Sequence, residues 1–112
     1  MVDRYPDDDN GDALRNMAMS GDDLSKARDV DFSLVFNSEA MAQRFCDIMS
    51  EDKVKLDCHH SDKRPGVWDV TVTSYIVPTH EAISALESRL AHLAAPLGGR
   101  NDGWGSFAVP LE

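Results

Sequence analysis

The sequence predicts a single α+β domain, a two-layer sandwich with helices on one face of a sheet. Residues 68–73 alternate strictly: Trp68, Val70 and Val72 share one side and polar residues share the other, which is typical of a half-buried strand. Residues 83–97 repeat isoleucine and leucine at helical spacing on one side. We expect this apolar stripe to cover the Trp68 side of the strand. The opposite side then faces water or a partner.

The remaining elements follow from local start and stop signals. In chain order we expect a short helix after Asp7-Asp8-Asp9 that ends at Gly21, a strand over 30–36, a helix capped by Asn37 or Ser38, a strand over 54–60, the strand from residue 68, a helix capped by Thr79 and stopped by Pro96 and Gly98-Gly99, a turn at Asp102-Gly103, and a short strand over 104–109. This order contains the split β-α-β pattern of ferredoxin-like sandwiches. We therefore predict a four-stranded antiparallel sheet with two long helices on one face, plus a short N-terminal helix.

Length and cysteine content indicate one soluble domain. The chain has 112 residues and two cysteines, Cys46 and Cys58, and it has no apolar run long enough for a signal sequence or a membrane span. We expect a cytoplasmic protein with reduced thiols; a Cys46–Cys58 disulfide is the alternative in an oxidising compartment. We interpret Leu111-Glu112 as the remnant of a cloning site and place the domain at residues 1–110.

The net charge of −9 indicates the sign of the charge that a partner would carry. Such a field repels phosphate backbones, so we expect no direct binding of nucleic acid, and it favours a basic protein segment. Solubility alone is the competing explanation of this charge. The acidic run at Asp7, Asp8, Asp9 and Asp12 also has two interpretations: it caps a helix, or it is an acidic docking patch.

Residues that could support catalysis or metal binding occur without a recognisable pattern. Cys58-His59-His60 lies in a predicted strand, where neighbouring side chains point to opposite faces, and a zinc site needs three or four converging ligands. We also find no nucleophile motif around Cys46 and no Gly-rich phosphate loop before a helix. We predict no catalytic residue, metal or cofactor. The alternative is a metal-dependent or thiol enzyme that uses Cys58, His59, His60 or His80. Asp57 and His92 are the other candidate ligands, and nothing places Asp69 and Glu81 on either side of a substrate bond.

The predicted open face of the sheet is unsuited to RNA. It carries Asp57 and Asp69 with little positive charge, and only Tyr75 and Trp104 could stack on bases. We interpret Trp68 and Trp104 as core residues first and recognition residues second. The face instead suits a basic or polar protein segment. The predicted partner-binding residues are Asp7, Asp8, Asp9, Asp12, Asp69, Thr71, Thr73 and Tyr75.

Several motifs resemble those of one protein family. In the N-terminal half these are Pro6-Asp7-Asp8-Asp9, Gly11-Asp12-Ala13-Leu14-Arg15, Asp23-Leu24-Ser25-Lys26 and Arg28-Asp29-Val30-Asp31-Phe32; in the C-terminal half they are Trp68-Asp69-Val70-Thr71-Val72-Thr73, Val77-Pro78-Thr79-His80-Glu81, Gly98-Gly99 and Asp102-Gly103-Trp104-Gly105. Their joint order over residues 5–107 resembles the RraB family, inhibitors of ribonuclease E. The chain departs from the family pattern at Ser106, where we expect cysteine.

The resemblance implies a small acidic bacterial protein of the cytoplasm with a ferredoxin-like fold. It also implies binding to the non-catalytic scaffold region of ribonuclease E and modulation of RNA decay without catalysis, by a monomer or weak oligomer. The chain ends soon after Phe107, and we expect weaker inhibition if the acidic C-terminal extension of longer relatives helps binding. An acidic mimic or adaptor that binds another basic protein is the alternative function.

Overall fold

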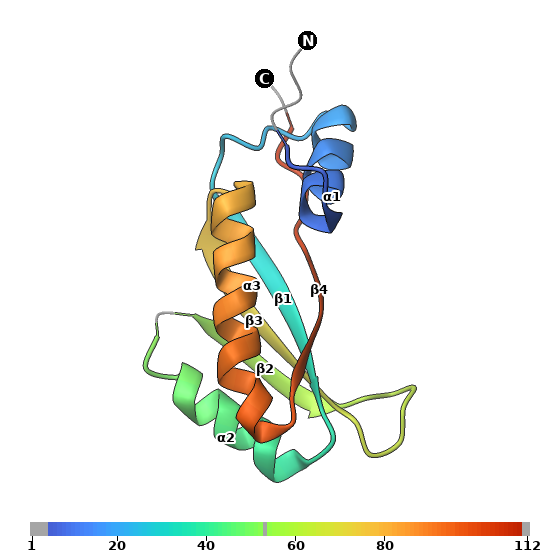
Figure 1. Ribbon diagram of the computed structural model, residues 1–112, viewed down its shortest axis with the longest axis vertical. Coiled ribbons are helices and arrows are strands. Elements are labelled where there is room, and N and C mark those ends of the chain that lie inside the picture. Colours follow the sequence, from blue (N-terminus) through green and yellow to red (C-terminus); the bar gives the residue numbers. More distant parts are fainter. Residues whose placement is uncertain (1–4, 53, 111–112) are drawn as a thin grey trace.

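The computed structural model describes residues 5–52 and 54–110. The elements are α1 (Asp9–Met19), β1 (Arg28–Phe36), α2 (Glu39–Met49), β2 (Lys55–His60), β3 (Trp68–Ile76), α3 (His80–Ala94), a short 3-10 helix η1 (Ala95–Leu97) and β4 (Arg100–Gly105) (Figure 1). The predicted order of helices and strands is therefore confirmed. The interpreted cloning remnant, Leu111-Glu112, lies outside the described residues.

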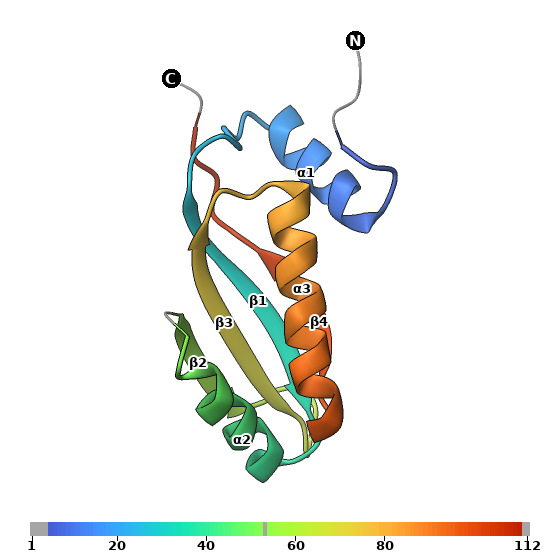
Figure 2. The ribbon, with the colours of Figure 1, turned by 60° about the vertical axis from the view of Figure 1, so that its left-hand side comes forward.

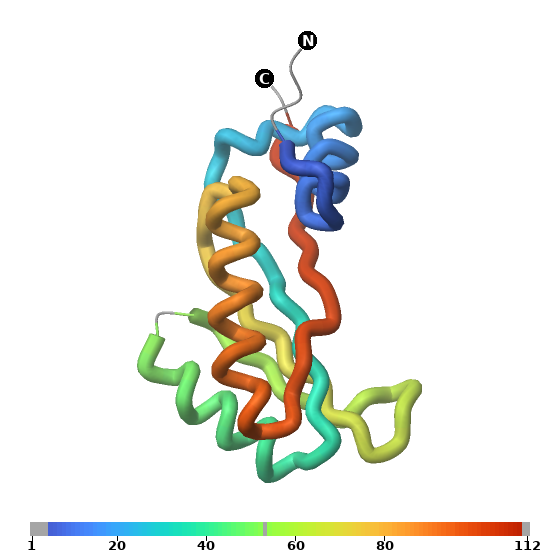
Figure 3. Tube along the Cα trace, viewed as in Figure 1, coloured from blue at the N-terminus to red at the C-terminus, as the bar shows by residue number. Residues whose placement is uncertain are grey.

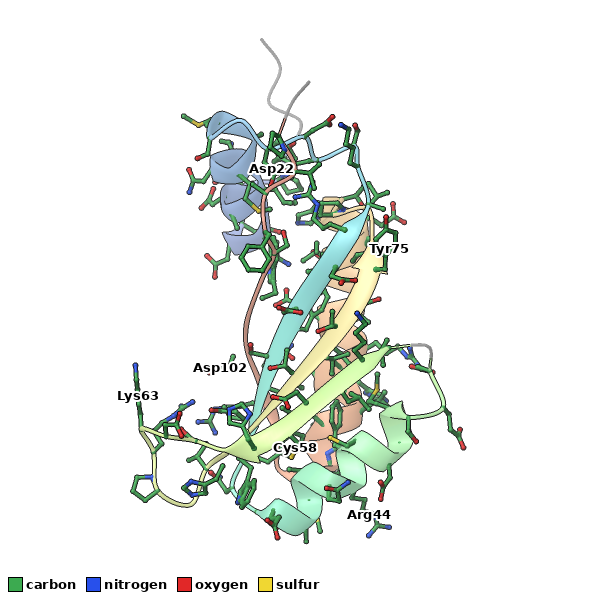
Figure 4. The ribbon with its side chains drawn as sticks, turned by 180° about the vertical axis from the view of Figure 1, so that it is seen from behind. Asp22, Arg44, Cys58, Lys63, Tyr75 and Asp102 are labelled. Atoms are coloured by element: carbon green, nitrogen blue, oxygen red, sulfur yellow. The ribbon has the colours of Figure 1, made fainter. Side chains whose placement is uncertain are left out.

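The four strands form one sheet in the order β2-β3-β1-β4, and every neighbouring pair is antiparallel. Helices α2 and α3 cover the same face of this sheet (Figure 2), and the other face is open (Figure 4). The prediction of two long helices is not confirmed, since the longer of them, α3, spans 15 residues. Helix α2 spans 11, as many as α1, because the chain enters β2 soon after Met49.

The core lies between the sheet and the two covering helices. Alternate residues of β1 and β3 are buried on that face and pack in one cluster with residues of α2 and α3. The rings of Phe36 and Phe45 approach to 5.2 Å between centroids, which joins β1 to α2. The apolar stripe of α3 packs on the Trp68 side of β3, as predicted. The buried cluster includes Val30, Phe32, Leu34, Phe36, Phe45, Met49, Val70, Val72, Ile83 and Leu90.

The helix boundaries follow the capping signals of the sequence. Asp8, Ser38 and Thr79 each adopt an extended backbone conformation, and each side chain accepts a hydrogen bond from the backbone N–H three residues later. These bonds satisfy N–H groups that have no partner within the helix. At the other end of α1, Gly21 adopts a φ of 92°, and its N–H donates to the carbonyl of Ala18. This left-handed residue ends α1 where predicted.

The last strand differs from its prediction. Residues Asp102-Gly103 were expected to form a turn before a strand over 104–109, but both belong to β4. Between the pairs Phe32–Trp104 and Leu34–Asn101, β4 has one residue more than β1. Gly103, at a φ of 96°, accommodates this β-bulge without ending the strand. A glycine that is typical of a turn therefore marks an irregularity inside the ladder.

A buried ion pair fastens the C-terminal segment to the connection between α1 and β1. Arg28 Nη1 lies 2.7 Å from both carboxylate oxygens of Asp22, and both side chains are almost fully buried. The Asp22 carboxylate also accepts a hydrogen bond from the Val109 N–H, and Arg28 donates to the carbonyl of Phe107. Asp22 therefore holds the C-terminal segment at the α1 end of the molecule, the end opposite α2 (Figures 3 and 4).

Candidate protein-binding surfaces

The open face of the sheet presents a polar row along β3. Asp69, Thr71, Thr73 and Tyr75 alternate with the buried Val70 and Val72 and so point away from the helices. Thr73 Oγ1 donates a 2.6 Å hydrogen bond to the carboxylate of Asp31 on β1. The Tyr75 side chain is 71% exposed near one end of the row (Figure 4). Half of the predicted partner-binding residues therefore share this surface.

Basic side chains and a histidine accompany the carboxylates of the open face. His59 Nδ1 lies 2.9 Å from Asp57, and Lys55 Nζ lies 3.8 Å from Asp29. An arginine of the β2–β3 loop adds a further cation: Arg64 Nη2 lies 3.6 Å from Asp69 and 3.4 Å from Asp102. The strand pattern did not predict the place of Arg64, which lies beside two carboxylates. The β2–β3 loop projects from the sheet (Figure 4), and the Arg64 side chain reaches from it to carboxylates of β3 and β4.

The acidic run at the start of α1 is partly used by the fold. Asp8 accepts a hydrogen bond from the Gly11 backbone N–H at 2.7 Å, and His80 Nε2 lies 2.8 Å from the same carboxylate. These two contacts hold the pKa of Asp8 below its ordinary value of 3.8, with the backbone bond as the larger cause. Asp12 pairs with Arg15 at 2.6 Å. Capping therefore accounts for Asp8, whereas Asp7 and Asp9 are exposed.

A single asparagine joins α1 to α3 and β4. Asn10 Nδ2 donates to Glu87 Oε1 at 2.7 Å and to Ser84 Oγ at 3.1 Å. Its Oδ1 accepts a 2.9 Å hydrogen bond from the indole N–H of Trp104. Asn101 Nδ2 adds a bond from β4 to the backbone carbonyl of Glu87. The Asn10 amide thus fixes both the Glu87 carboxylate and the Trp104 ring, by contacts with residues far away in the sequence.

A groove of about 620 Å³ lies among these three elements. We call it the α1–β4 groove. It joins acidic side chains to an indole ring and to amide groups, and among the described residues its lining contains no lysine or arginine. Its lining residues are Asp8, Asp9, Asn10, Ala13, Glu87, Asn101, Gly103 and Trp104.

The structure separates the predicted partner-binding residues into two groups. Asp8 and Asp9 line the α1–β4 groove, and Asp7 and Asp12 lie on the same helical end, whereas the β3 row lies on the open face of the sheet. Sequence reasoning missed the groove residues Asn10, Glu87 and Asn101. Glu87 lies directly beside the apolar stripe of α3, and Asn10 follows the acidic run, so neither stands out by type or spacing.

The residues of the cysteine and histidine cluster are divided between the two faces of β2. Cys58 packs against the core while His59 points to the open face, as the strand alternation predicted. Burial raises the pKa of Cys46 to about 11, and burial also raises the pKa of Cys58. Both thiols are therefore protonated at neutral pH, which disfavours a nucleophilic role. Within residues 5–52 and 54–110, no three His, Cys, Asp or Glu side chains are grouped to hold a metal ion.

The comparison with protein families decides the assignment. A family model described as "Regulator of ribonuclease activity B" matches residues 7–106, almost the whole chain. The chain belongs to the RraB family. A search of curated proteins finds no match. None of the helices in the described part of the chain is both long and apolar enough to cross a membrane.

Membership of the RraB family changes how both surfaces are interpreted. The matched region begins at Asp7 and includes the whole α1–β4 groove and the polar row of β3. The family description is of a regulator of ribonuclease activity, which implies a ribonuclease partner. The groove and the open face are the two polar candidates for the surface that binds it. In this RraB chain Lys55 and Arg64 lie beside carboxylates of the open face, whereas no lysine or arginine among the described residues lines the groove.

Proposed function

We propose that this chain binds ribonuclease E at its non-catalytic scaffold region and inhibits its endonuclease activity, so that it modulates RNA decay. The RraB family match over residues 7–106 is the observation that carries the proposal. The net charge of −9 supports it, because an acidic protein is attracted to a basic protein segment and repelled by RNA itself. The proposal places the chain in the bacterial cytoplasm together with its partner.

We assign two roles to the predicted partner-binding residues. Asp7, Asp9 and Asp12 lie at the start of α1 and steer the encounter with a basic segment, because carboxylates at a surface act mainly on the association rate. Asp8 contributes to the same field while capping the helix. The β3 row offers hydrogen-bonding groups and the exposed Tyr75 ring, which suit a polar contact that follows the encounter.

Binding and inhibition are tested with purified proteins. Ribonuclease E that carries its scaffold region should be retained by the immobilised chain, and cleavage of an RNA substrate should slow as the chain is added. Ribonuclease E without the scaffold region is the control, and it should be neither retained nor inhibited. Retention should weaken as salt is raised, because exposed charges are screened. Equal retention of both forms contradicts the scaffold assignment, and no retention at low salt contradicts the proposal itself.

A second candidate is an acidic adaptor for another basic protein. The net charge favours it, because the charge selects the sign of a partner and not its identity. Capture from the native lysate, read by mass spectrometry, separates the two functions. Enrichment of ribonuclease E supports the first proposal. Enrichment of a different basic protein, with ribonuclease E absent, supports the second.

We also propose that the fold is a ferredoxin-like sandwich. The β-α-β-β-α-β order after α1 and the strand order β2-β3-β1-β4 support this description. An experimental structure with a different helix placement on the sheet would contradict it.

A further inference from the structure

We propose that the α1–β4 groove holds an arginine side chain of the partner's basic segment, with the guanidinium against the Trp104 ring and between the carboxylates of Asp9 and Glu87. This inference rests on the proposed function, because it takes the partner to be a basic protein segment. It goes further by naming the docking surface and the residue type that the surface receives.

Charge favours the groove over the open face. In the part of the chain that the structure describes, the groove is lined by Asp8, Asp9 and Glu87 without a lysine or arginine in its lining. On the open face Asp69 already has Arg64 at 3.6 Å. A cation that enters the groove meets carboxylates with no lysine or arginine in that lining, whereas one that approaches Asp69 must displace a cation. The groove is therefore the surface with the larger electrostatic gain for a basic side chain.

The groove is organised before any partner arrives. Glu87 Oε1 is held by the Asn10 amide at 2.7 Å, and the other carboxylate oxygen of Glu87 remains for a further donor. The Trp104 ring is held by its N–H bond to the same amide. A site whose side chains are already fixed binds with a smaller entropy cost than one that must be ordered.

The chemistry of the lining selects arginine over lysine. A guanidinium is planar, stacks on aromatic faces and donates to carboxylates at its edge, whereas an ammonium is a strongly hydrated point charge. Tryptophan is the aromatic side chain that binds a cation best. The groove of about 620 Å³ lies within the range of about 300–1,000 Å³ that is usual for ligand sites, so it has room for this side chain. The bulge at Gly103 interrupts the edge of β4, so we expect side chains rather than an added strand to make the contact.

The two tryptophans of the chain allow a direct test by NMR. The ¹⁵N-labelled chain is titrated with the scaffold region of ribonuclease E, and the two indole N–H signals are followed. Trp104 lies in the groove. Trp68 is the first residue of β3, and its ring packs against His60. The Trp104 signal should shift and saturate while the Trp68 signal stays in place. Saturable binding that leaves Trp104 unmoved overturns the inference.

Charge-matched variants test the same contact by affinity. Asp9→Asn combined with Glu87→Gln removes two charges from the groove, and the glutamine side chain of Glu87→Gln keeps an oxygen for the Asn10 amide. Asp47→Asn combined with Glu51→Gln removes two charges from exposed positions in and after α2, the control. We expect the groove variant to bind the scaffold region about fivefold to tenfold more weakly than wild type, and the control to lose about twofold or less. Equal losses assign the effect to net charge alone and overturn the inference.

A peptide arm separates this inference from the proposed function. Short blocked peptides that contain either arginine or citrulline are added to the labelled chain, since citrulline keeps the shape of arginine and lacks its charge. The arginine peptide should shift the Trp104 indole signal more than the citrulline peptide does. Where ribonuclease E fails to bind but the arginine peptide shifts Trp104, the proposed function fails and the groove assignment stands. Where ribonuclease E binds and the two peptides act alike, the groove assignment fails alone.

Discussion

Two Asp–Arg pairs in the chain have similar distances and very different burial. Arg28 Nη1 lies 2.7 Å from Asp22, and their side chains are 5% and 3% exposed. Arg15 Nη1 lies 2.6 Å from Asp12, and their side chains are 29% and 57% exposed. The replacements Asp22→Asn and Asp12→Asn remove the same charge and keep the same side-chain shape. Comparing them isolates the effect of burial on the free energy of unfolding.

The expected loss is much larger at Asp22. The asparagine of Asp22→Asn keeps an oxygen for the Val109 N–H but leaves the guanidinium of Arg28 buried without this counter-charge. Removing one partner of a buried ion pair costs about 3–5 kcal/mol, whereas an exposed pair contributes about 0–1 kcal/mol. A domain of this size is stable by about 5–15 kcal/mol. Asp22→Asn therefore removes a large share of the stability, and Asp12→Asn removes little.

Urea unfolding followed by tryptophan fluorescence measures both losses. A loss for Asp22→Asn no larger than that for Asp12→Asn would refute the argument from burial. Should Asp22→Asn fail to fold, the double variant Asp22→Leu/Arg28→Met provides a second measurement, since apolar groups often replace a buried pair without net cost. Its stability should exceed that of the single variant. Amide exchange at Val109 should rise in Asp22→Asn, because a neutral amide oxygen accepts the Val109 hydrogen bond more weakly than a carboxylate does.

Three further predictions concern single contacts. In Gly99→Ala the new Cβ would lie 2.3 Å from a ring carbon of Phe36. We expect the free energy of unfolding to fall by about 1–3 kcal/mol, measured as a lower midpoint of thermal unfolding. An unchanged midpoint would show that the ring moves aside freely. Thr79→Ala removes the cap of α3 and should cost about 1 kcal/mol in urea unfolding, whereas Thr79→Ser should retain most of it. The pKa of Asp8 is lowered in the folded state, so the stabilisation from its carboxylate is present above pH 3.8 and is lost as the pH falls through the lowered value. The difference in the free energy of unfolding between wild type and Asp8→Asn should therefore shrink over this acidic range. A difference that does not change with pH would contradict the assigned contacts.

Local signals explain why most of the fold could be predicted from sequence. The alternation around Val70 and the caps Ser38 and Thr79 depend on residues only a few positions apart, and the structure places each as expected. The β4 prediction failed because Asp102-Gly103 is as typical of a bulge as of a turn. Only the register of β4 against β1 distinguishes the two.

The groove could not be predicted because its contacts are long-range. Asn10 bonds to Glu87 and Trp104, which lie 77 and 94 positions further along the chain. No periodicity connects such residues, so the place of α1 against α3 and β4 does not follow from the local sequence. The acidic run stands out in the sequence, but the contact of Asp8 with His80, 72 positions further along the chain, does not follow from it.

The internal ion pairs do not reduce the attraction that the chain exerts at long range. Each pair contains one negative and one positive charge. The pairs therefore contribute nothing to the net charge, which is −9. The pairs instead decide where the uncompensated charge lies. Arg64 lies beside Asp69 on the open face, while no lysine or arginine among the described residues lines the groove beside Glu87. In the proposed function, the field of the whole chain attracts the basic segment, and the arrangement of the cations favours the groove over the open face as the place where it binds.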